Sequence, residues 1–359
     1  MISHISNVEI VGMAAAVSEN WQSLREISNE DSKVVDKFIR KTGVEGRYSC
    51  SPRQTTSDFC VAAAESIISH KNITKKDVGI LVFVTQTPDY RIPATACVIA
   101  HRLKLNDDLI AFDVNLGCSG FVNGVNIVAS LLQNTEAEYG LLLAGDTSAR
   151  EFKSNERTKT GHSASMLFGD SGTATLVKKS RGAALDVSLN TDGDGYEAIF
   201  APYGQWRNPD APEGVGTNSS MDDIAVFNFA TDKVPVQIND YMQREGTTPD
   251  DYDCLVLHQA NLMIMKRIAK KTSFPAEKML ISMNKFGNTS SASIPITLVS
   301  EYGNTQNRKI HALCSGFGVG LSWGTVGLYL DADDILPLVH TDEYYVDGYN
   351  LNDKESKNE

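Results

Sequence analysis

The segment DVNLGCSGF, residues 113–121, decides the fold, because an apolar strand pattern runs through a glycine-flanked cysteine into a helical pattern. Its strand, 109–114, resembles two other short apolar runs, at 78–85 and 139–145. Continuous runs of this kind are typical of strands buried on both faces. Residues 120–132 then place apolar side chains at helical spacing. This alternation predicts an α/β architecture with largely buried sheets.

A second junction of the same form occurs later in the chain. The segment SMNKFGNTSS, residues 282–291, joins a short apolar stretch to a helical pattern, after a predicted strand at 252–257 and helix at 260–271. Each half then ends in a Gly-rich β segment, at 168–177 and at 316–330. The correspondence suggests an ancient duplication of one unit.

The charged stretch KKSRG marks the expected boundary between the two halves, near 178–183. We therefore predict an N-terminal half at 1–178, a C-terminal half at 184–330 and an acidic extension at 331–359. The polar, Gly- and Pro-rich region 203–223 is expected to be a loop near a site. In the extension, the tyrosine pair YY at 344–345 is expected to pack, and the chain beyond it to fray.

Composition excludes several classes of protein. The chain has 359 residues, of which 42% are hydrophobic, and a formal net charge of −12, so nucleic acid is not an expected partner. Its six cysteines include no CxxC pair, which argues against a disulfide framework or a structural zinc site. No Lys or Arg precedes Arg25, and no apolar run is long enough to span a membrane. We expect a soluble, cytoplasmic protein without a metal.

Cys118 is the first candidate for chemistry. It lies between a predicted strand and a predicted helix, where backbone N–H groups and the helix dipole favour an anion. That position predicts a lowered thiol pKa and a nucleophilic thiolate. Gly117 and Gly120 permit a tight turn and close approach of a substrate. The alternative is a small buried residue in a tightly packed junction, which is the more common role of a lone cysteine.

His258 and Asn288 are the other two candidates. His258 ends a predicted strand, and sites in open α/β sheets cluster at the carboxyl ends of strands. Asn288 lies at the second strand–helix junction, where it could simply cap a helix. If the halves are duplicated, Cys118 and Asn288 occupy equivalent positions and face each other beside His258. A thiol nucleophile with two neutral hydrogen-bond donors around one acyl carbon predicts acyl transfer.

Four segments in order carry a resemblance to a known family: NLGCSGF, LHQAN, KFGNTSSASIP and GFGVGLSWG, beginning at residues 115, 257, 285 and 316. They resemble the signature segments of β-ketoacyl–acyl-carrier-protein synthase III, a thiolase-fold condensing enzyme. FGDSGTATL and RKTGVEGRY are also similar, so the resemblance covers nearly the whole chain. It implies two duplicated βαβαβαββ halves in a five-layered αβαβα architecture.

The resemblance also implies a mechanism. Cys118 matches the residue that takes an acyl group from a primer thioester. His258 and Asn288 match the pair that binds the thioester carbonyl of a malonyl-carrier protein during decarboxylation, and the carbanion then attacks the acyl group. The oxyanion hole is expected at the backbone N–H groups of Cys118 and Val319, the latter standing where the family usually has glycine. No cofactor is implied, because acyl-CoA or acyl-carrier protein is the substrate.

Partners are implied in the same way. Basic residues on the predicted helix after LHQAN, with one in TDKVPV, are expected to dock an acyl carrier protein; they are Lys233, Lys266, Arg267, Lys270 and Lys271. The alternative is an ordinary solvated basic face. Ile92 matches a position that crosses a dimer interface to line the acyl pocket of the partner, so a homodimer is implied.

Three positions depart from the family pattern. Lys37 and His162 stand where many members clamp the adenine of coenzyme A with a tryptophan and an arginine, and Met263 replaces an arginine near the phosphopantetheine. These changes favour a specialised pathway and a carrier-bound acyl donor. Two other functions stay open at this point: non-decarboxylating acyl transfer to an alcohol or amine, with His258 as general base, and a partner subunit of a heterodimeric condensing enzyme.

Overall fold

The computed structural model describes residues 1–150, 166–212 and 219–347. Its helices in chain order are α1 (Leu24–Ile27), α2 (Ser32–Thr42), α3 (Thr56–Lys71), α4 (Thr95–Leu103), α5 (Gly120–Asn134), α6 (Asp223–Glu245), α7 (Leu262–Lys271), α8 (Met283–Phe286) and α9 (Ser293–Tyr302). Its strands are β1 (Ile2–Val17), β2 (Trp21–Ser23), β3 (Gly46–Tyr48), β4 (Val78–Val84), β5 (Ile110–Val114), β6 (Tyr139–Asp146), β7 (Ser171–Thr191), β8 (Ile199–Phe200), β9 (Ser220–Met221), β10 (Cys254–Leu257), β11 (Lys309–Gly318), β12 (Ser322–Asp331) and β13 (Val339–His340).

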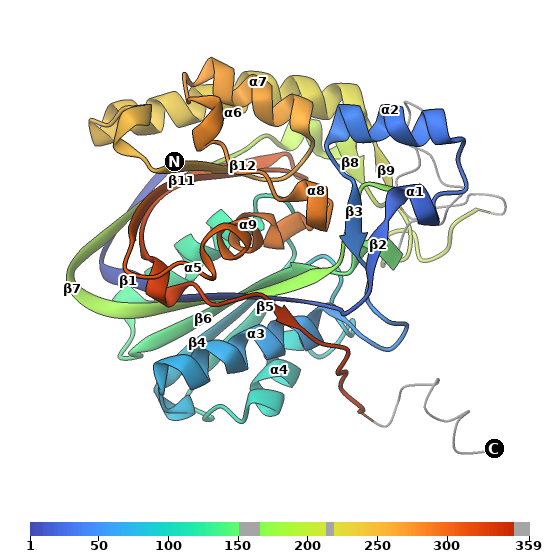
Figure 1. Ribbon diagram of the computed structural model, residues 1–359. Coiled ribbons are helices and arrows are strands. Elements are labelled where there is room, and N and C mark those ends of the chain that lie inside the picture. The colour runs from blue at the N-terminus through green and yellow to red at the C-terminus, as the bar shows by residue number, and fades with distance from the viewer. Residues whose placement is uncertain (151–165, 213–218, 348–359) are drawn as a thin grey trace, which may run out of the picture.

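The elements stack in five layers (Figure 1). Helices α6 and α7 cover one outer face and α3 and α4 the other, while α5 and α9 lie between the sheets. The main path of strands runs β10-β11-β12-β7-β6-β4-β5. The long strand β7 pairs with β6 through its first part and with β12 through its last, so it links the two sheet layers. This is the predicted αβαβα architecture.

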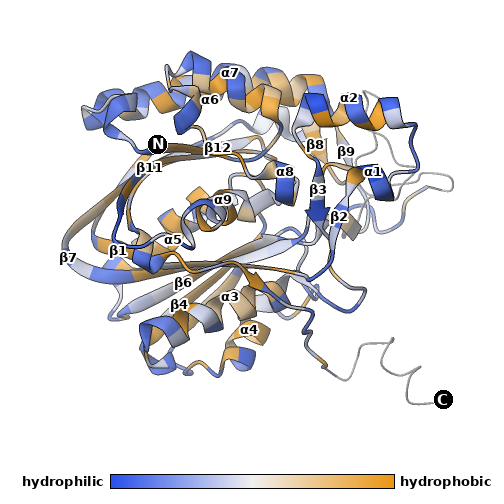
Figure 2. Ribbon diagram, in the orientation of Figure 1, coloured by the Kyte–Doolittle hydropathy of each residue, from blue (hydrophilic) through white to orange (hydrophobic). Residues whose placement is uncertain are grey.

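Burial of apolar side chains holds these layers together. Phe121, Val125 and Leu132 of α5 are almost fully buried, as are Ile294 and Leu298 of α9. A central helix that is apolar on all sides fits a position between two sheets. The outer helices instead alternate between hydrophilic and hydrophobic residues along their length (Figure 2).

The sequence predictions for individual strands and helices agree with the structure, apart from three differences. Strand β5 is not buried on both faces, because it forms an edge of the sheet and Ile110 is exposed. The apolar stretch at 279–283 forms no strand: Met279 makes one isolated bridge to Leu255, and the short helix α8 begins at Met283. The two junctions at Cys118 and Asn288 are therefore less alike than the duplication suggested.

The third difference concerns the expected boundary at 178–183. These residues lie within β7, whose pairing with β1 continues across them with a bulge between Ser6 and Val8. The chain passes between the halves as one strand, and the division into 1–178 and 184–330 stays a prediction. Beyond β12, the chain returns to the sheet as β13, which pairs in parallel with the end of β1.

Two global findings bear on the remaining expectations. Each of the six cysteines, all of which fall within the described ranges, is a free thiol. In the parts of the chain with described coordinates, no helix is long and apolar enough to cross a membrane.

Candidate active site

Cys118 lies in the turn between β5 and α5, where three glycines let other chain segments approach. A Cβ at Gly117 would lie 2.2 Å from the side-chain oxygen of Gln86, and one at Gly120 would lie 2.5 Å from Val84. A Cβ at Gly318 would lie 2.5 Å from the Cβ of Cys118. The end of β11 therefore packs directly on the cysteine, and side chains at these glycines would displace it.

The protonation state of Cys118 differs from the prediction. Burial raises the pKa of its thiol to about 11, although the N–H of Val319, the N–H of Cys118 itself and the Ser290 hydroxyl act in the opposite direction. The expected lowering by the helix N-terminus is wrong, because removal from water penalises the thiolate more than these donors stabilise it. At neutral pH the Cys118 side chain is therefore a neutral thiol.

His258 follows β10 and is almost fully enclosed, with 1% of its surface exposed. Its Nδ1 shares a hydrogen bond of 2.7 Å with the Ser293 hydroxyl, and the ring of Phe317 packs against it edge-on at 5.5 Å between centroids. Burial lowers the pKa of His258 to about 3. The imidazole is therefore neutral over the physiological range, as required of a neutral hydrogen-bond donor.

Asn288 is held by its backbone and by one of its side-chain atoms. Its N–H donates to the carbonyl of Leu167 at 2.8 Å, and its Oδ1 accepts from the N–H of Ser290 at 2.9 Å. The preceding Gly287 has φ +66°, in a place where a Cβ would lie 2.9 Å from the Leu167 carbonyl. The amide oxygen is thus occupied, which leaves the Nδ2 hydrogens as the donors Asn288 can offer to a substrate.

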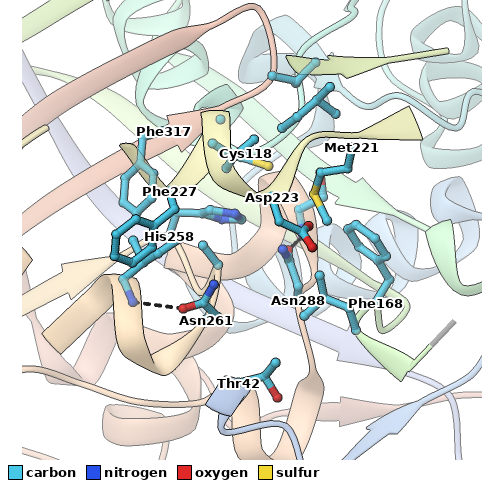
Figure 3. A pocket seen from close by; sticks show the side chains of 18 of the residues that line it. Thr42, Cys118, Phe168, Met221, Asp223, Phe227, His258, Asn261, Asn288 and Phe317 are labelled. Carbon is cyan, nitrogen blue, oxygen red and sulfur yellow. Dashed lines mark hydrogen bonds between the residues drawn. The ribbon is translucent and has the colours of Figure 1, made fainter. Parts of the chain in front are cut away.

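One cavity of about 360 Å³ brings these groups together. Cys118, His258, Asn288 and Val319 all line it, and the first three surround a common space in Figure 3. Its other walls are mostly apolar and come from several elements; they include Phe38, Leu167, Phe168, Phe200, Met221, Ile224, Phe227, Met263, Ile264 and Phe317. An apolar channel that ends at a few convergent polar groups is typical of an enzyme site for a largely apolar substrate.

The remaining predicted residues lie outside the catalytic end of the cavity. Ile92 does not line the cavity within a single chain and is 79% exposed. Met263 lines it, and Lys37 lies exposed on α2. His162 falls outside the described residues. Region 203–223 borders the cavity where it is described, through residues such as Met221 in β9.

The basic residues expected to dock a carrier protein all lie exposed on α6 or α7. They differ in how they are held. Lys271 pairs with Asp232 at 3.0 Å and donates to the Thr231 carbonyl, so it also ties α7 to α6. The guanidinium of Arg267 lies 5.9 Å from the ring of Phe227. Lys266 and Lys270 project from the same helix without a contact of this kind among the described residues.

The sequence reasoning missed two supporting residues. Ser293 fixes the His258 ring, and Gln86 lines the cavity next to Gly117. Ser293 lies in the same segment as Asn288, but only the three-dimensional contact shows its partner. Among the described residues, no group of His, Cys, Asp and Glu side chains could hold a metal ion.

Comparisons with known proteins identify the family. Residues 112–193 match the family model described as 3-oxoacyl-[acyl-carrier-protein] synthase III, and residues 242–330 match its C-terminal model. A β-ketoacyl-[acyl-carrier-protein] synthase III from Wolbachia pipientis wMel is 32% identical, over 84% of this chain and 94% of that protein. One from Clostridium perfringens is 28% identical, over 89% of this chain and 98% of that protein.

A solved structure gives the same result. The crystal structure of a 3-oxoacyl-(acyl-carrier protein) synthase from Burkholderia xenovorans has a TM-score of 0.88 and 30% identity, and the match covers 95% of this chain and 99% of that one. The predicted thiolase-like fold and the resemblance drawn from the four motifs are thereby confirmed. The chain belongs to the β-ketoacyl-acyl-carrier-protein synthase III family of thiolase-fold condensing enzymes.

Proposed function

We propose that this chain is an acyltransferase that loads an acyl group on Cys118 and condenses it with a malonyl unit carried by an acyl carrier protein. The observation that carries the proposal is one mostly apolar cavity lined by the Cys118 thiol, the buried neutral His258 imidazole and the Asn288 amide, whose oxygen already accepts a hydrogen bond. In the proposed reaction the thiol takes the acyl group, and the imidazole and the amide together donate to the malonyl thioester oxygen. Together the three groups are the minimum set for acyl loading and decarboxylative Claisen condensation.

The first half-reaction transfers the acyl group. The Cys118 sulfur attacks the thioester carbonyl, a new carbon–sulfur bond forms, and the bond to the departing thiol breaks. The proton of the Cys118 thiol ends on that leaving thiol, so no cofactor or metal is needed. The N–H groups of Cys118 and Val319, both of which interact with the Cys118 sulfur, can hold the oxyanion of the tetrahedral intermediate.

The second half-reaction forms the carbon–carbon bond. The malonyl carboxylate leaves as CO₂, and its electron pair becomes an enolate whose oxygen accepts hydrogen bonds from His258 and Asn288. A role for His258 as donor places its ring proton on Nε2, and Nδ1 then accepts from the Ser293 hydroxyl. The enolate carbon attacks the acyl-Cys118 carbonyl, the carbon–sulfur bond breaks, and the Cys118 thiolate takes a proton from water.

The non-decarboxylating alternative uses His258 as a general base toward an alcohol or amine. A pKa of about 3 makes His258 a weak base, which favours the donor role. Asn288 has no task in that alternative. A partner subunit without catalysis would need none of the three groups, so their convergence in one cavity also speaks against it.

The docking proposal rests on charge at the cavity mouth. Helix α7 presents Lys266 and Lys270, and α2, which packs against α7, presents Lys37, Arg40 and Lys41 to solvent. Lys41 also lines the cavity. On a chain of net charge −12, this basic surface can steer an acidic carrier protein toward the site. Lys37, which replaces the expected tryptophan of the adenine clamp, adds to the charge and supports a carrier-bound donor.

A homodimer completes the proposal. Strand β5 leaves an unpaired edge, and unpaired edges of this kind are sites for pairing with another chain. Ile92, 79% exposed in a single chain, would be buried in a dimer that uses this side of the sheet. With free thiols throughout the chain, the reaction is assigned to the cytoplasm.

The experiment that tests the function incubates the protein with acyl-CoA and acyl-carrier thioesters and measures the mass of the peptide that holds Cys118. We expect an acyl adduct that is absent in Cys118→Ala. Malonyl-carrier protein should then release CO₂, and Asn288→Ala should slow this release by about 100-fold, as expected for loss of one oxyanion donor. Acylation without CO₂ release would favour the non-decarboxylating alternative, and no acylation would refute the proposal.

A further inference from the structure

The chain continues past the last residue matched by the family model, residue 330, and residues 339–347 form a segment that we name the C-terminal arm. The arm begins as β13, alongside the end of β1, and the N–H of Thr341 donates to the Val17 carbonyl at 2.9 Å. In Figure 1 it is the dark red segment that leaves the sheet beside α3 and α4. Its contacts connect it to a loop near the active site.

The first of these contacts are with the start of α3. The buried Gln54 side chain donates to the carbonyls of Thr341 at 2.7 Å and Glu343 at 3.2 Å. The N–H of Tyr345 donates to Oδ1 of Asp58 at 2.9 Å. These bonds fix the main chain of the arm against the first turn of the helix.

The arm also encloses an ion pair. Arg102 of α4 donates to the same Asp58 oxygen at 2.7 Å, and the ring of Tyr345 lies 4.8 Å from its guanidinium. The two charged side chains are only 10% and 3% exposed. Tyr345 therefore contributes a backbone hydrogen bond to Asp58 and an aromatic ring that packs over Arg102. A buried ion pair such as Asp58–Arg102 is destabilised when one of its hydrogen-bond partners is lost.

The opposite side of the same helical turn holds the loop at residues 85–94. Arg102 donates to the Ser57 hydroxyl, which in turn donates to Oδ2 of Asp89, both at 2.7 Å. The Thr56 hydroxyl bonds to that of Thr87 at 2.8 Å. The loop and the arm are thus connected by the chain of contacts Asp89–Ser57–Arg102–Asp58–Tyr345.

The connection matters because Asp89 has few other anchors. It is half-buried, its Oδ1 lacks a hydrogen-bond partner among the described residues, and its carboxylate interacts with the hydroxyls of Ser57 and Thr55. Its N–H donates to the Thr95 hydroxyl at 3.0 Å, and the Ser57 hydroxyl, which donates to its Oδ2, is the contact that connects it to Arg102. The orientation of Ser57 follows from Arg102, whose own position depends on Asp58 and Tyr345.

The loop carries two residues with a place in the proposed reaction. Gln86 lines the cavity beside Gly117, and Ile92 is the exposed residue expected to reach the acyl pocket of a second copy. We propose that the C-terminal arm is a positioning element: by clamping Asp58 and Arg102 it sets the 85–94 loop, and through Ile92 it sets which acyl chains the enzyme accepts. This inference rests on the proposed function.

The test compares two shortened chains. A protein that ends after Asp347 keeps the contacts of the arm with Gln54, Asp58 and Arg102 and is the matched control; one that ends after His340 loses them. In the second, we expect backbone hydrogen exchange in 85–94 to become about tenfold faster. The ratio of kcat/KM for short and long acyl donors should also shift several-fold, which a simple loss of folded protein would not produce.

Single substitutions keep the test decisive if the shorter chain does not fold. Tyr345→Phe keeps the ring and the N–H and should behave as the unchanged protein. Tyr345→Ala removes the ring that packs over Arg102, and Tyr345→Pro removes the N–H that donates to Asp58. Both substitutions should speed backbone hydrogen exchange in residues 85–94. Unchanged exchange and unchanged acyl preference in these variants would overturn the proposal. If no donor acylates Cys118 in the unchanged protein, the proposed function fails, while hydrogen exchange still decides whether the arm fixes the loop.

Discussion

The reactivity of Cys118 toward an alkylating reagent should depend on pH in a way that separates two physical effects. A helix N-terminus alone would favour the thiolate near neutral pH. Burial acts in the opposite direction and raises the pKa to about 11. The experiment therefore varies the pH of the free enzyme and measures the rate at which the Cys118 thiol is alkylated.

The expected magnitude follows from the fraction of thiolate. At pH 7 a thiol of pKa 9 is about 1% ionised, whereas one of pKa 11 is about 0.01% ionised. Iodoacetamide should therefore react about 100-fold more slowly with Cys118 than with an ordinary thiol at the same exposure. The rate should rise about tenfold for each pH unit until it approaches pH 10.

The assay quenches the reaction at a series of times and pH values and measures the alkylated Cys118 peptide by mass. Cys118→Ala gives the background from the other five cysteines. A plateau reached below pH 8 would refute the reasoning, because it would show that the helix N-terminus and the surrounding N–H donors outweigh burial. The pH profile would then support a resting thiolate rather than activation on substrate binding.

Three further outcomes are expected. Decarboxylation of malonyl-carrier protein should show no acid limb near pH 6.5, because a pKa of about 3 keeps His258 neutral there; a limb that His258→Gln abolishes would contradict this. Ser293→Ala should slow decarboxylation about tenfold while leaving acylation of Cys118 largely unchanged, since it removes the bond that orients the imidazole, and equal losses in both steps would argue against that role. Lys270→Glu should raise the KM for a carrier-protein substrate and weaken its salt dependence, whereas Lys309→Glu, at the exposed start of β11 and not on α2, α6 or α7, should not.

The residues alone predicted an alternation of strands and helices, the family resemblance implied the five layers, and the structure brings the three candidate site residues Cys118, His258 and Asn288 into one cavity. Apolar runs buried in the sheets and the glycine-flanked junction at Cys118 depend on local chain properties, so they can be read from the order of residues. Strand β5 could not be placed at an edge in this way, because the composition of a strand does not show which neighbours it has. The charged residues near 178–183 do not interrupt the chain as a linker would: they lie within β7, which pairs with β1 on both sides of a bulge, and the division into two halves stays a prediction.

The protonation states needed the three-dimensional structure. The helix N-terminus beside Cys118 is visible in the sequence, but the packing of Gly318 against its Cβ is not, and the packing decides the direction of the pKa shift. The contact of His258 with Ser293 joins residues 35 positions apart. The contacts of Tyr345 with α3 and α4 are more distant still, although the expectation that the tyrosine pair packs is confirmed.

The neutral state of both reacting groups has a chemical advantage in a condensing enzyme. Loss of CO₂ requires the malonyl carboxylate to give up its charge to the enolate oxygen, and a protonated imidazole beside it would stabilise the starting carboxylate as well as the enolate. Because burial keeps His258 uncharged, its donor can favour the enolate oxygen without forming an ion pair with the carboxylate. The raised pKa of Cys118 likewise follows from burial, and it is compatible with acyl transfer because the thiol needs to lose its proton only when an acyl thioester is bound.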